Sequence, residues 1–451
     1  MTQVKLPTGL AGVEDTPKIN ESLVNMFSLE GTLLRTPGID LAFTANTYSC
    51  RGSATWYVDE TLYKVIGQYF YRIDRATGPQ QIGSISGTSD VVFSLGQVNL
   101  VIIVKGGAGY TYNQISGLQQ ITDPDFLPSD SVDFIDGRHV FIPSDGSPAF
   151  YSDIDNAGSI NPLSFFDAEE LPDLNKFVIN IKNDLYIMGS EASQRFRVTQ
   201  SSTTPFVRRE GSRVDVGYVC GGIRYLDTFA FIGRQRGESY AVHAMGQGSA
   251  QAISNATVNE MLNTRYDVND LEKSYSFSFK WHGRQFVGWT IKNDTIAYVD
   301  GNWIILDSEI QNGTGPWTAK GVSFAYGKYY VGDRIGNNIG ILSESASEYD
   351  DNLECEISTF FRSSTRKSYF PIRSIILDAL SGNGPSTIGL SISNNGREYG
   401  PINYVSLGEI GEYNQVIRWS GGLGRYESFA GIKLRMTGQV RISIDSLDVR
   451  L

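Results

Sequence analysis

"DGRHVFIPSDGSPAFYSD", residues 136–153, is the stretch that points to the fold. One Asp-Gly pair precedes an apolar run, a second follows it, and the next run ends in aromatic residues. Asp-Gly supplies the positive φ angles that a two-residue hairpin turn demands. We therefore expect Asp136-Gly137 and Asp145-Gly146 to be turns between antiparallel strands, not parts of an acid–base or metal site.

The same strand–turn–strand unit recurs along the chain at intervals of 37 to 56 residues. Its other copies cover 59–74, 96–113, 183–199, 226–244, 282–300 and 326–344. This spacing suits four-stranded antiparallel blades around an axis. Each blade has a sheet face that it cannot bury alone, so neighbouring blades must stack, and closure of the ring hides the sheet edges. Seven hairpins predict a β-propeller of six or seven blades, with a solenoid as the alternative.

The composition favours the same all-β class. The chain has 451 residues, of which 48 are Gly and 47 are Tyr or Phe, a mix typical of pleated surfaces with glycine at the corners. The formal net charge of −11 argues against sequence-independent binding to DNA phosphates. Cys50, Cys220 and Cys355 form no CxxC pair, which argues against a zinc knuckle or a disulfide framework and favours synthesis in a reducing cytoplasm.

The patterning divides the chain into three parts. Residues 1–50 are expected to contribute to propeller closure, and 51–345 to form the propeller itself. The polar acidic stretch at 343–352 separates the propeller from 353–451, where apolar and polar residues alternate as in a small antiparallel β-sandwich. No apolar run is long enough to span a bilayer, so we expect no membrane insertion by this chain.

The sequence offers no catalytic, cofactor or metal motif. His139, His243 and His282 lack metal-ligand spacing and are interpreted as strand or turn residues. The segment 153–158 resembles the start of a calcium loop, but Ser164 stands where the loop needs a glutamate. We therefore expect no catalytic residue, no cofactor and no metal.

Two other functions stay open at this point. A propeller-type glycan hydrolase could use a pair among Asp123, Asp125, Glu169 and Glu170, with Asp173 nearby. A carbohydrate-binding adhesin could stack sugars on the sandwich residues Trp419 and Tyr399, although we favour core or interface roles for both aromatics.

Two segments break the repeating pattern. "SNATVNEMLN", 254–263, predicts a short helix capped by Ser254, with Val258, Met261 and Leu262 on one face. We expect this helix to pack between blades, the alternative being a docking helix for a partner. The basic stretch 362–373 contains Arg362, Arg366, Lys367 and Arg373 and is expected to be a solvated loop.

Several motifs together resemble the packaged-DNA stabilisation proteins, or tail hub (nozzle) proteins, of short-tailed phages. They are "SLVNMF" and "LLRTPGID" near the N-terminus, "DGRHVF" and "SPAFYSD" in the middle, and "SISNNGREYGP" and "VIRWSGGLGRYESFAGIKLRMTG" near the C-terminus. The C-terminal motifs are the most specific. The resemblance covers both ends of the chain and much of its middle.

This resemblance implies a structural virion protein of the phage tail, made and assembled in the host cytoplasm, and not an enzyme. It implies a homo-oligomeric ring, expected to be hexameric, below the portal and its adaptor. The ring would extend the DNA channel without sequence-specific binding, stabilise the packaged genome and anchor tail spikes or fibres and a plug or needle. Structural or interfacial roles would fall on Asn25, Arg35, Pro37, Gly38, Asn395, Gly396, Tyr399, Arg418, Trp419, Arg425 and Lys433.

Overall fold

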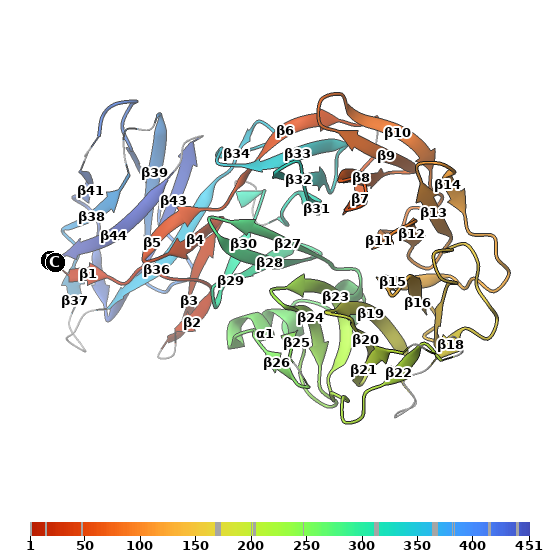
Figure 1. Cartoon of the computed structure of the whole chain (residues 1–451). Helices are drawn as coiled ribbons and strands as arrows, with labels where there is room; N and C mark the ends of the chain where they lie inside the picture. The colour runs from red at the N-terminus through yellow and green to blue at the C-terminus, as the bar shows by residue number, and fades with distance from the viewer. Residues whose placement is uncertain are drawn as a thin grey trace.

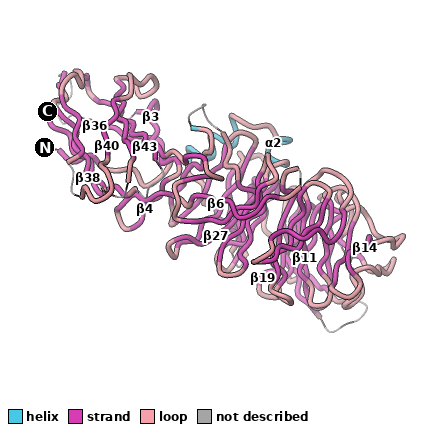
Figure 2. The backbone as a smooth tube through the Cα atoms, turned by 90° about the horizontal axis from the view of Figure 1, so that it is seen from above, coloured by secondary structure: helices cyan, strands magenta, loops and turns pink. Residues whose placement is uncertain are grey.

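Seven antiparallel sheets stand around a common axis in the computed structural model of this chain, and a β-sandwich lies beside them (Figure 1). The structure describes residues 2–451 except 14–15, 47, 167–172, 200, 202–203, 247, 311–314, 363–368, 381, 383, 414–415 and 439–441. The predicted all-β class, a propeller followed by a sandwich, is confirmed. Seen from above, the molecule is elongated, with the sandwich and both termini at one end (Figure 2).

The first four blades each contain four strands that are consecutive in sequence. Blade 1 comprises β7 (Cys50–Trp56), β8 (Thr61–Ile66), β9 (Tyr69–Asp74) and β10 (Gly78–Ser84). Blade 2 comprises β11 (Val91–Leu95), β12 (Leu100–Val104), β13 (Gly109–Asn113) and β14 (Gly117–Gln120). Blade 3 comprises β15 (Ser129–Ile135), β16 (Arg138–Pro143), β17 (Ala149–Tyr151) and β18 (Phe165–Phe166). Blade 4 comprises β19 (Asn175–Ile181), β20 (Asp184–Gly189), β21 (Ser193–Val198) and β22 (Phe206–Arg208).

Blades 5 and 6 follow the same order, and blade 7 borrows a strand. Blade 5 comprises β23 (Gly217–Tyr225), β24 (Thr228–Arg234), β25 (Ala241–Met245) and β26 (Ala250–Ala252). Blade 6 comprises β27 (Tyr275–Trp281), β28 (Arg284–Ile291), β29 (Asp294–Val299) and β30 (Asn302–Leu306). Blade 7 comprises β31 (Ala319–Ala325), β32 (Lys328–Asp333), β33 (Asn338–Ser343) and β6 (Gly38–Thr44), extended by β34 (Ser347–Glu348) and β35 (Asp351–Asn352).

The repeated unit found in the sequence corresponds to the second and third strands of each blade. These strands lie between two neighbours in the sheet, and β8, β12 and β16 are buried at every position. Strands covered on both faces read as continuous apolar runs, which is why they stand out in the sequence. The first and fourth strands have half-exposed positions and give a weaker signal.

One of the two expected Asp-Gly hairpins is confirmed and the other is wrong. Asp136 and Gly137 have φ angles of 50° and 76° and form the two-residue turn between β15 and β16. The connection from β16 to β17 instead spans residues 144–148, and of its Asp-Gly pair only Gly146 has a positive φ, of 79°. The Asp145 carboxylate accepts the Ser147 N–H at 2.9 Å, which stabilises this wider loop.

The ring closes through a strand from the N-terminal segment. β6 pairs antiparallel with β33, from Gly38 opposite Ser343 to Thr44 opposite Asn338, and so supplies the fourth strand of blade 7. At the seam between blades 1 and 7, the Ser53 hydroxyl and the Lys64 ammonium both donate to the Gly321 carbonyl, at 2.6 and 2.8 Å. Lys64 is completely buried, and burial lowers the pKa of its ammonium group.

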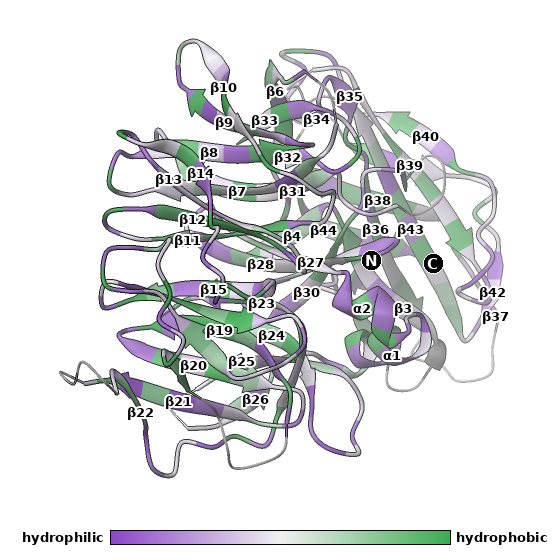
Figure 3. Ribbon diagram, turned by 90° about the vertical axis from the view of Figure 1, so that its right-hand side faces the viewer, coloured by the Kyte–Doolittle hydropathy of each residue, from purple (hydrophilic) through white to green (hydrophobic). Residues whose placement is uncertain are grey.

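The sandwich has two sheets, and both contain N-terminal strands. One has the order β4-β5-β44-β38-β41 with β1 paired to β44, and the other runs β3-β36-β43-β39-β40 with β2 paired to β3. Apolar and polar residues alternate along strands such as β43 (Figure 3). The N-terminal strands are β1 (Thr2–Val4), β2 (Ala11–Val13), β3 (Thr16–Val24), β4 (Met26–Leu29) and β5 (Thr32–Arg35). The C-terminal strands are β36 (Cys355–Arg362), β38 (Ser374–Ala379), β39 (Ser386–Ser393), β40 (Asn403–Ser406), β41 (Ile417–Ser420), β43 (Phe429–Gly438) and β44 (Ser443–Arg450). Outside these two sheets, β37 (Tyr369–Pro371) pairs with β42 (Arg425–Glu427) as a separate ribbon.

The N-terminal residues therefore divide between the two modules, which differs from the expected boundaries. Within residues 1–50, β6 completes the last blade, whereas β1, β3, β4 and β5 pair with strands of the sandwich. The stretch 343–352, expected to separate the modules, contains β34, which pairs with β6. The edge of a sheet needs a partner strand, and that strand can come from a distant part of the chain. Local patterning therefore does not show which module a strand joins.

The expected helix is α1 (Ala256–Thr264), and the shorter α2 (Val268–Glu272) follows it. Val258, Met261 and Leu262 are buried as predicted, in a core between blades 5 and 6 that includes Trp289 and Trp303. The predicted cap is wrong by one residue, because the side chain of Asn255, not of Ser254, accepts the Val258 N–H, at 2.9 Å. Within the residues described, no helix is long and apolar enough to cross a membrane.

The closing strand makes Gly38 intolerant of any side chain. A Cβ there would lie 2.2 Å from the Ser345 carbonyl oxygen and 2.6 Å from that of Ser347. We expect Gly38→Ala to lower the free energy of unfolding by about 1–3 kcal/mol in denaturant titrations, since backbone must move to relieve the overlap. Gly158→Ala is the control, because a Cβ there meets nothing closer than 3.8 Å. Equal stability of the two variants would contradict this account of closure.

Candidate functional site: the propeller channel and the propeller–sandwich junction

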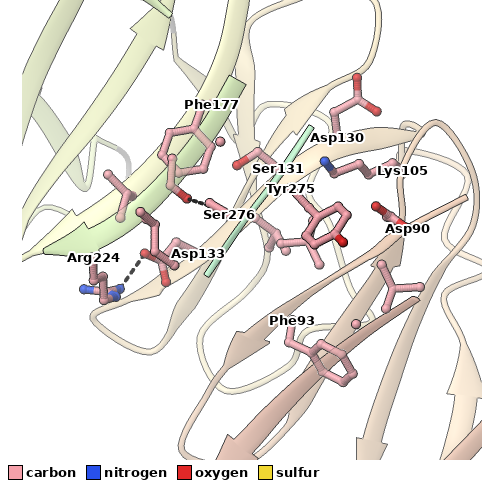
Figure 4. Close-up of a pocket in the computed structure, with 18 of the residues that line it drawn as sticks. Asp90, Phe93, Lys105, Asp130, Ser131, Asp133, Phe177, Arg224, Tyr275 and Ser276 are labelled. Atoms are coloured by element: carbon pink, nitrogen blue, oxygen red, sulfur yellow. Dashed lines mark hydrogen bonds and ion pairs between the residues drawn. The ribbon is translucent and has the colours of Figure 1, made fainter. Parts of the chain in front are cut away.

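The innermost strands of the seven blades line a cavity of about 910 Å³ on the propeller axis (Figure 4). β7, β11, β15, β19, β23, β27 and β31 all contribute residues to its wall. The wall mixes apolar side chains such as Phe93 and Phe177 with charged ones such as Asp133 and Arg224. A cavity with apolar walls and a few polar groups is a usual place for a ligand or an active site, so the charged groups of this wall bear directly on function.

Three carboxylates in the channel wall face cations. Lys320 Nζ lies 2.6 Å from Asp90 Oδ1, and Arg224 Nη2 lies 2.8 Å from Asp133 Oδ2. On a third pair, Lys176 Nζ is 3.6 Å from Glu272 Oε1. A glycosidase needs two carboxyl groups that face each other across a substrate. Each of these three carboxylates faces a cation from a different part of the fold: Lys320 of blade 7, Arg224 of blade 5 and Lys176 of blade 4. Such pairs hold separate elements of the propeller together.

The pKa of the Asp133 carboxyl group is raised by burial, against the lowering effect of Arg224 and of the Asn180 and Phe134 N–H groups. Asp133 Oδ2 accepts the Asn180 N–H at 2.7 Å, so this one side chain links blades 3, 4 and 5. Contacts between blades thus account for the burial of the Asp133 carboxylate.

The acids that the sequence offered for a glycosidase pair do not line this channel where they are described. Asp123 accepts the N–H groups of Asp125 and Ile160, at 2.9 and 3.0 Å, and so orders a loop. Asp173 accepts the N–H groups of Ser190, Glu191 and Ala192. Glu169 and Glu170 lie outside the described residues.

The three histidines are far apart in the fold and have individual structural contacts. His139 Nδ1 is 2.8 Å from the Ser94 hydroxyl, and burial lowers the pKa of the ring to about 3. Burial also lowers the pKa of His243. His282 Nε2 is 3.1 Å from Glu344 Oε1. Across the described ranges, no group of three His, Cys, Asp or Glu side chains could hold a metal ion.

Asn25 joins the propeller to the sandwich. Its side-chain amide donates to the carbonyls of Asp307 and Glu354, at 2.6 and 2.8 Å, and accepts the Asp307 N–H at 2.9 Å. Asp307 follows blade 6 and Glu354 precedes β36, so one side chain binds backbone from both modules. Asn25 is buried and has a φ of 56°, a conformation that asparagine tolerates better than other residues with a side chain.

The other N-terminal candidates lie at the same junction. Arg35 is buried at the end of β5, and its Nη1 donates to the Gly438 carbonyl at 2.9 Å. Pro37 is buried, and with Thr36 it forms the short link from β5 to β6, which starts at Gly38. Asn25, Arg35, Pro37 and Gly38 are therefore brought together by the fold.

Four of the C-terminal candidates, Asn395, Gly396, Tyr399 and Lys433, lie close together in the sandwich. Asn395 and Gly396 form a turn in which the Asn395 amide oxygen accepts the N–H of Arg397 at 2.9 Å. Lys433 Nζ lies 4.8 Å from the centre of the Tyr399 ring and 2.8 Å from Glu356 Oε1. Burial and the Glu356 charge raise the pKa of Tyr399.

Trp419 cannot serve as an exposed sugar platform. It is buried in the sandwich core, and its indole N–H donates to the Asn403 carbonyl at 2.8 Å. Arg418, next to it on β41, and Arg425, on β42, are exposed. Trp419 therefore packs inside the sandwich, whereas Arg418 and Arg425 face solvent.

Several buried charged residues were not predicted from the sequence, and two of them lie at structural seams. One is Lys64 at the seam, which appears in the sequence as a single lysine inside the apolar run "LYKVI". The other is Glu348 at the junction, which carries no local signal. Burial raises the pKa of the Glu348 carboxyl group, the hydrogen bonds from Ser308 and Trp317 lower it, and the charges of Asp307 and Asp333 raise it; the resulting pKa is about 7.

Comparison with known protein families finds matches to both modules. Residues 17–347 match the family described as bacteriophage P22 Gp10, β-propeller, and residues 359–451 match the family described as bacteriophage P22 Gp10, β-sandwich. Among curated proteins, the tail hub protein gp10 of Salmonella phage P22 is 19% identical, over 93% of this chain and 91% of that protein.

Two of the solved structures that the chain resembles are distant from it. The Cps50 (Swd1) β-propeller domain of Myceliophteria thermophila is 7% identical with a TM-score of 0.46, over 68% of this chain and 99% of that one. PorZ of Porphyromonas gingivalis, a surface component of the type-IX secretion system, is 10% identical with a TM-score of 0.40, over 76% of this chain and 44% of that one. Likeness at this level carries no functional information.

We expect Asn25→Ala to destabilise the protein by about 2–4 kcal/mol in denaturant unfolding, because buried backbone groups of both modules lose their partner and alanine resists the positive φ. Asn25→Gly is the matched control, since it removes the same hydrogen bonds but accepts the backbone angle. Glycine should therefore cost less than alanine. If neither substitution changes stability, Asn25 does not hold the junction.

Glu348 should make stability depend on pH. Its folded-state pKa of about 7 lies above the ordinary value of 4.5, so the folded state binds more protons than the unfolded state between these values. The contribution of Glu348 to stability therefore falls as pH rises from about 4.5 to 7. Glu348→Gln should remove this dependence and be more stable than the parent protein at pH 8, by up to about 3 kcal/mol. Parallel stability–pH curves for the two proteins would refute the assignment.

Proposed function

Because this chain belongs to the family of the bacteriophage P22 Gp10 proteins, in both its β-propeller and its β-sandwich, we propose that it forms a ring, expected to be hexameric, in a phage tail. The chain is a structural component of the phage tail. In our proposal the ring sits below the portal and its adaptor, extends the DNA channel and helps to retain the packaged genome. Tail spikes or fibres and a plug or needle attach to it, and assembly takes place in the host cytoplasm.

The observation that carries this proposal is the extent of the match. Both modules match in the same order, and the curated tail hub protein aligns with 93% of the chain. The way in which the propeller and the sandwich are joined supports a role for the chain in bearing mechanical load. The two modules share one sheet, in which β3 pairs with both β30 of the propeller and β36 of the sandwich, and they share one hydrophobic core. A unit built in this way moves as one body.

The charge distribution supports a conduit for DNA. Residues 1–352, which include the propeller, carry 27 Lys and Arg against 40 Asp and Glu, whereas 353–451 carry 11 against nine. A negatively charged wall makes few phosphate contacts, so a duplex can slide past it without sequence-specific binding. We place the DNA lumen between protomers, since the propeller axis of each protomer is lined by inter-blade ion pairs.

We propose no catalytic role for the chain. Asp90, Asp133 and Glu272 each face a cation in the propeller channel, and Asp123 and Asp173 order loops. These contacts account for the carboxylates without a substrate, and they favour the ring over the glycan hydrolase. Burial of Trp419 likewise weighs against the adhesin.

The ring can be tested by measuring mass and symmetry with and without a purified phage portal–adaptor complex. We expect a six-fold ring docked coaxially on the adaptor, seen by light scattering and then by negative-stain imaging. The portal–adaptor complex alone is the control for its own mass and symmetry. A chain that stays monomeric at high concentration with the adaptor present would overturn the proposal.

A further inference from the structure

The turns of blades 1 to 3 carry exposed apolar side chains on adjoining tips. Ile115 is 98% exposed, and Tyr57, Val58, Val98 and Ile154 are between 48% and 58% exposed. We call these five residues the tip patch. Single exposed apolar residues are ordinary on a protein surface, but a contiguous group of them marks an interaction site.

Hydrogen bonds between the tips hold these side chains together. The Gln114 amide donates to Asp59 Oδ2 at 3.0 Å, and Asn113 donates to the Asn99 amide oxygen at 3.0 Å. Asn99 in turn donates to the Asp155 carbonyl at 3.2 Å. The exposed residues Val58, Val98, Ile115 and Ile154 each stand next in sequence to one of these bonded residues. The polar side chains thus bind tip to tip while their apolar neighbours face outward, which gives a preorganised surface.

The charge around the tip patch has a single sign. The turns that form it, 57–60, 96–99, 114–116, 136–137 and 152–159, contain Asp59, Glu60, Asp136, Asp153 and Asp155 and no Lys or Arg. A partner that covers this surface should therefore combine apolar or aromatic side chains with cations.

The opposite end of the same chain has that chemistry. On the β37–β42 ribbon of the sandwich, Tyr369 is exposed, and Arg425 pairs with Pro371. Arg373 follows the ribbon, and its N–H donates to the Arg450 carbonyl at 2.8 Å. Arg373 and Arg425 are exposed, and within the described part of the chain neither forms an ion pair. We call Tyr369, Arg373 and Arg425 the sandwich end; the first two belong to the basic stretch 362–373 and Arg425 to the strand paired with it.

We propose that the tip patch of one protomer docks on the sandwich end of the next. This inference rests on the proposed ring and names its contact. Blades 2 and 3 lie at the end of the molecule away from the sandwich (Figures 1 and 2), so the two surfaces cannot meet within one chain. A contact between two different surfaces of identical chains is heterologous, and such a contact closes into a ring when its rotation permits.

The contact can be tested with two double variants. Ile115→Asp/Ile154→Asp adds charge to the tip patch, and Arg373→Glu/Arg425→Glu reverses the sandwich end. All four positions are exposed, so unfolding midpoints should match the parent protein. On the portal–adaptor complex, each variant alone should lose ring formation, with association weakened at least about tenfold, or about 1.4 kcal/mol. Leu226→Asp, at an exposed blade 5 turn outside the tip patch, is the matched control and should assemble normally.

Mixing the two variants tests the direction of the contact. Each retains one intact surface, and the two altered surfaces are both acidic and repel each other. An equimolar mixture should therefore form one-to-one dimers and no larger species in native mass spectrometry. A mixture in which both variants remain monomeric would overturn the proposal. So would normal rings from the Ile115→Asp/Ile154→Asp variant, which would assign the tip patch to another tail protein. Failure of the parent protein to form any ring would instead refute the proposed function itself.

Discussion

Closure of the propeller by β6 is the constraint on which the rest of the structure depends. β6 pairs with β33 and completes blade 7, and blade 7 then packs on blade 1 through the shared Gly321 carbonyl. The same strand begins three residues after β5 ends in the sandwich. The propeller therefore cannot open at this seam without pulling on the sandwich, and the sandwich cannot swing away without pulling on the closing strand.

That linkage explains why buried polar residues gather where the two modules meet. Asn25 satisfies backbone groups from both modules, and Glu348 is buried beside Asp307 and Asp333. Burying such groups is costly unless their partners are fixed, so they specify one arrangement of the modules more than they add stability. A tail component that must transmit load without bending benefits from such an arrangement. The propeller channel follows the same logic, since ion pairs of its wall join blade 3 to blade 5, the residue before blade 2 to blade 7, and blade 4 to α2.

The sequence predicted the parts of the fold that are encoded locally. Middle strands of the blades, such as β12 and β16, are buried at every position and read as largely apolar runs because both of their faces are covered, and Asp136-Gly137 forms a two-residue turn. Two predictions were wrong at places where the local residues allow more than one pattern of hydrogen bonds. Asp145-Gly146 opens into a wider loop, and Asn255 rather than Ser254 caps α1. Among the candidate site residues, the N-terminal group gathers at the junction, whereas the C-terminal group divides between a cluster around Tyr399 and separate positions on β41 and β42.

By itself, the sequence determined the all-β class, the repeated hairpins, the order of propeller and sandwich, and the family to which the chain belongs. The first three of these properties depend on alternation and on turn residues, which act over a few positions of the chain, and the family rests on similarity to known sequences. Only the tertiary structure decided that β1, β3, β4 and β5 join the sandwich while β6 closes the ring, that Trp419 is buried, and that the tips of three blades form one surface. The partner of a strand edge and the burial of a side chain depend on segments hundreds of residues away, and local patterning carries no record of them.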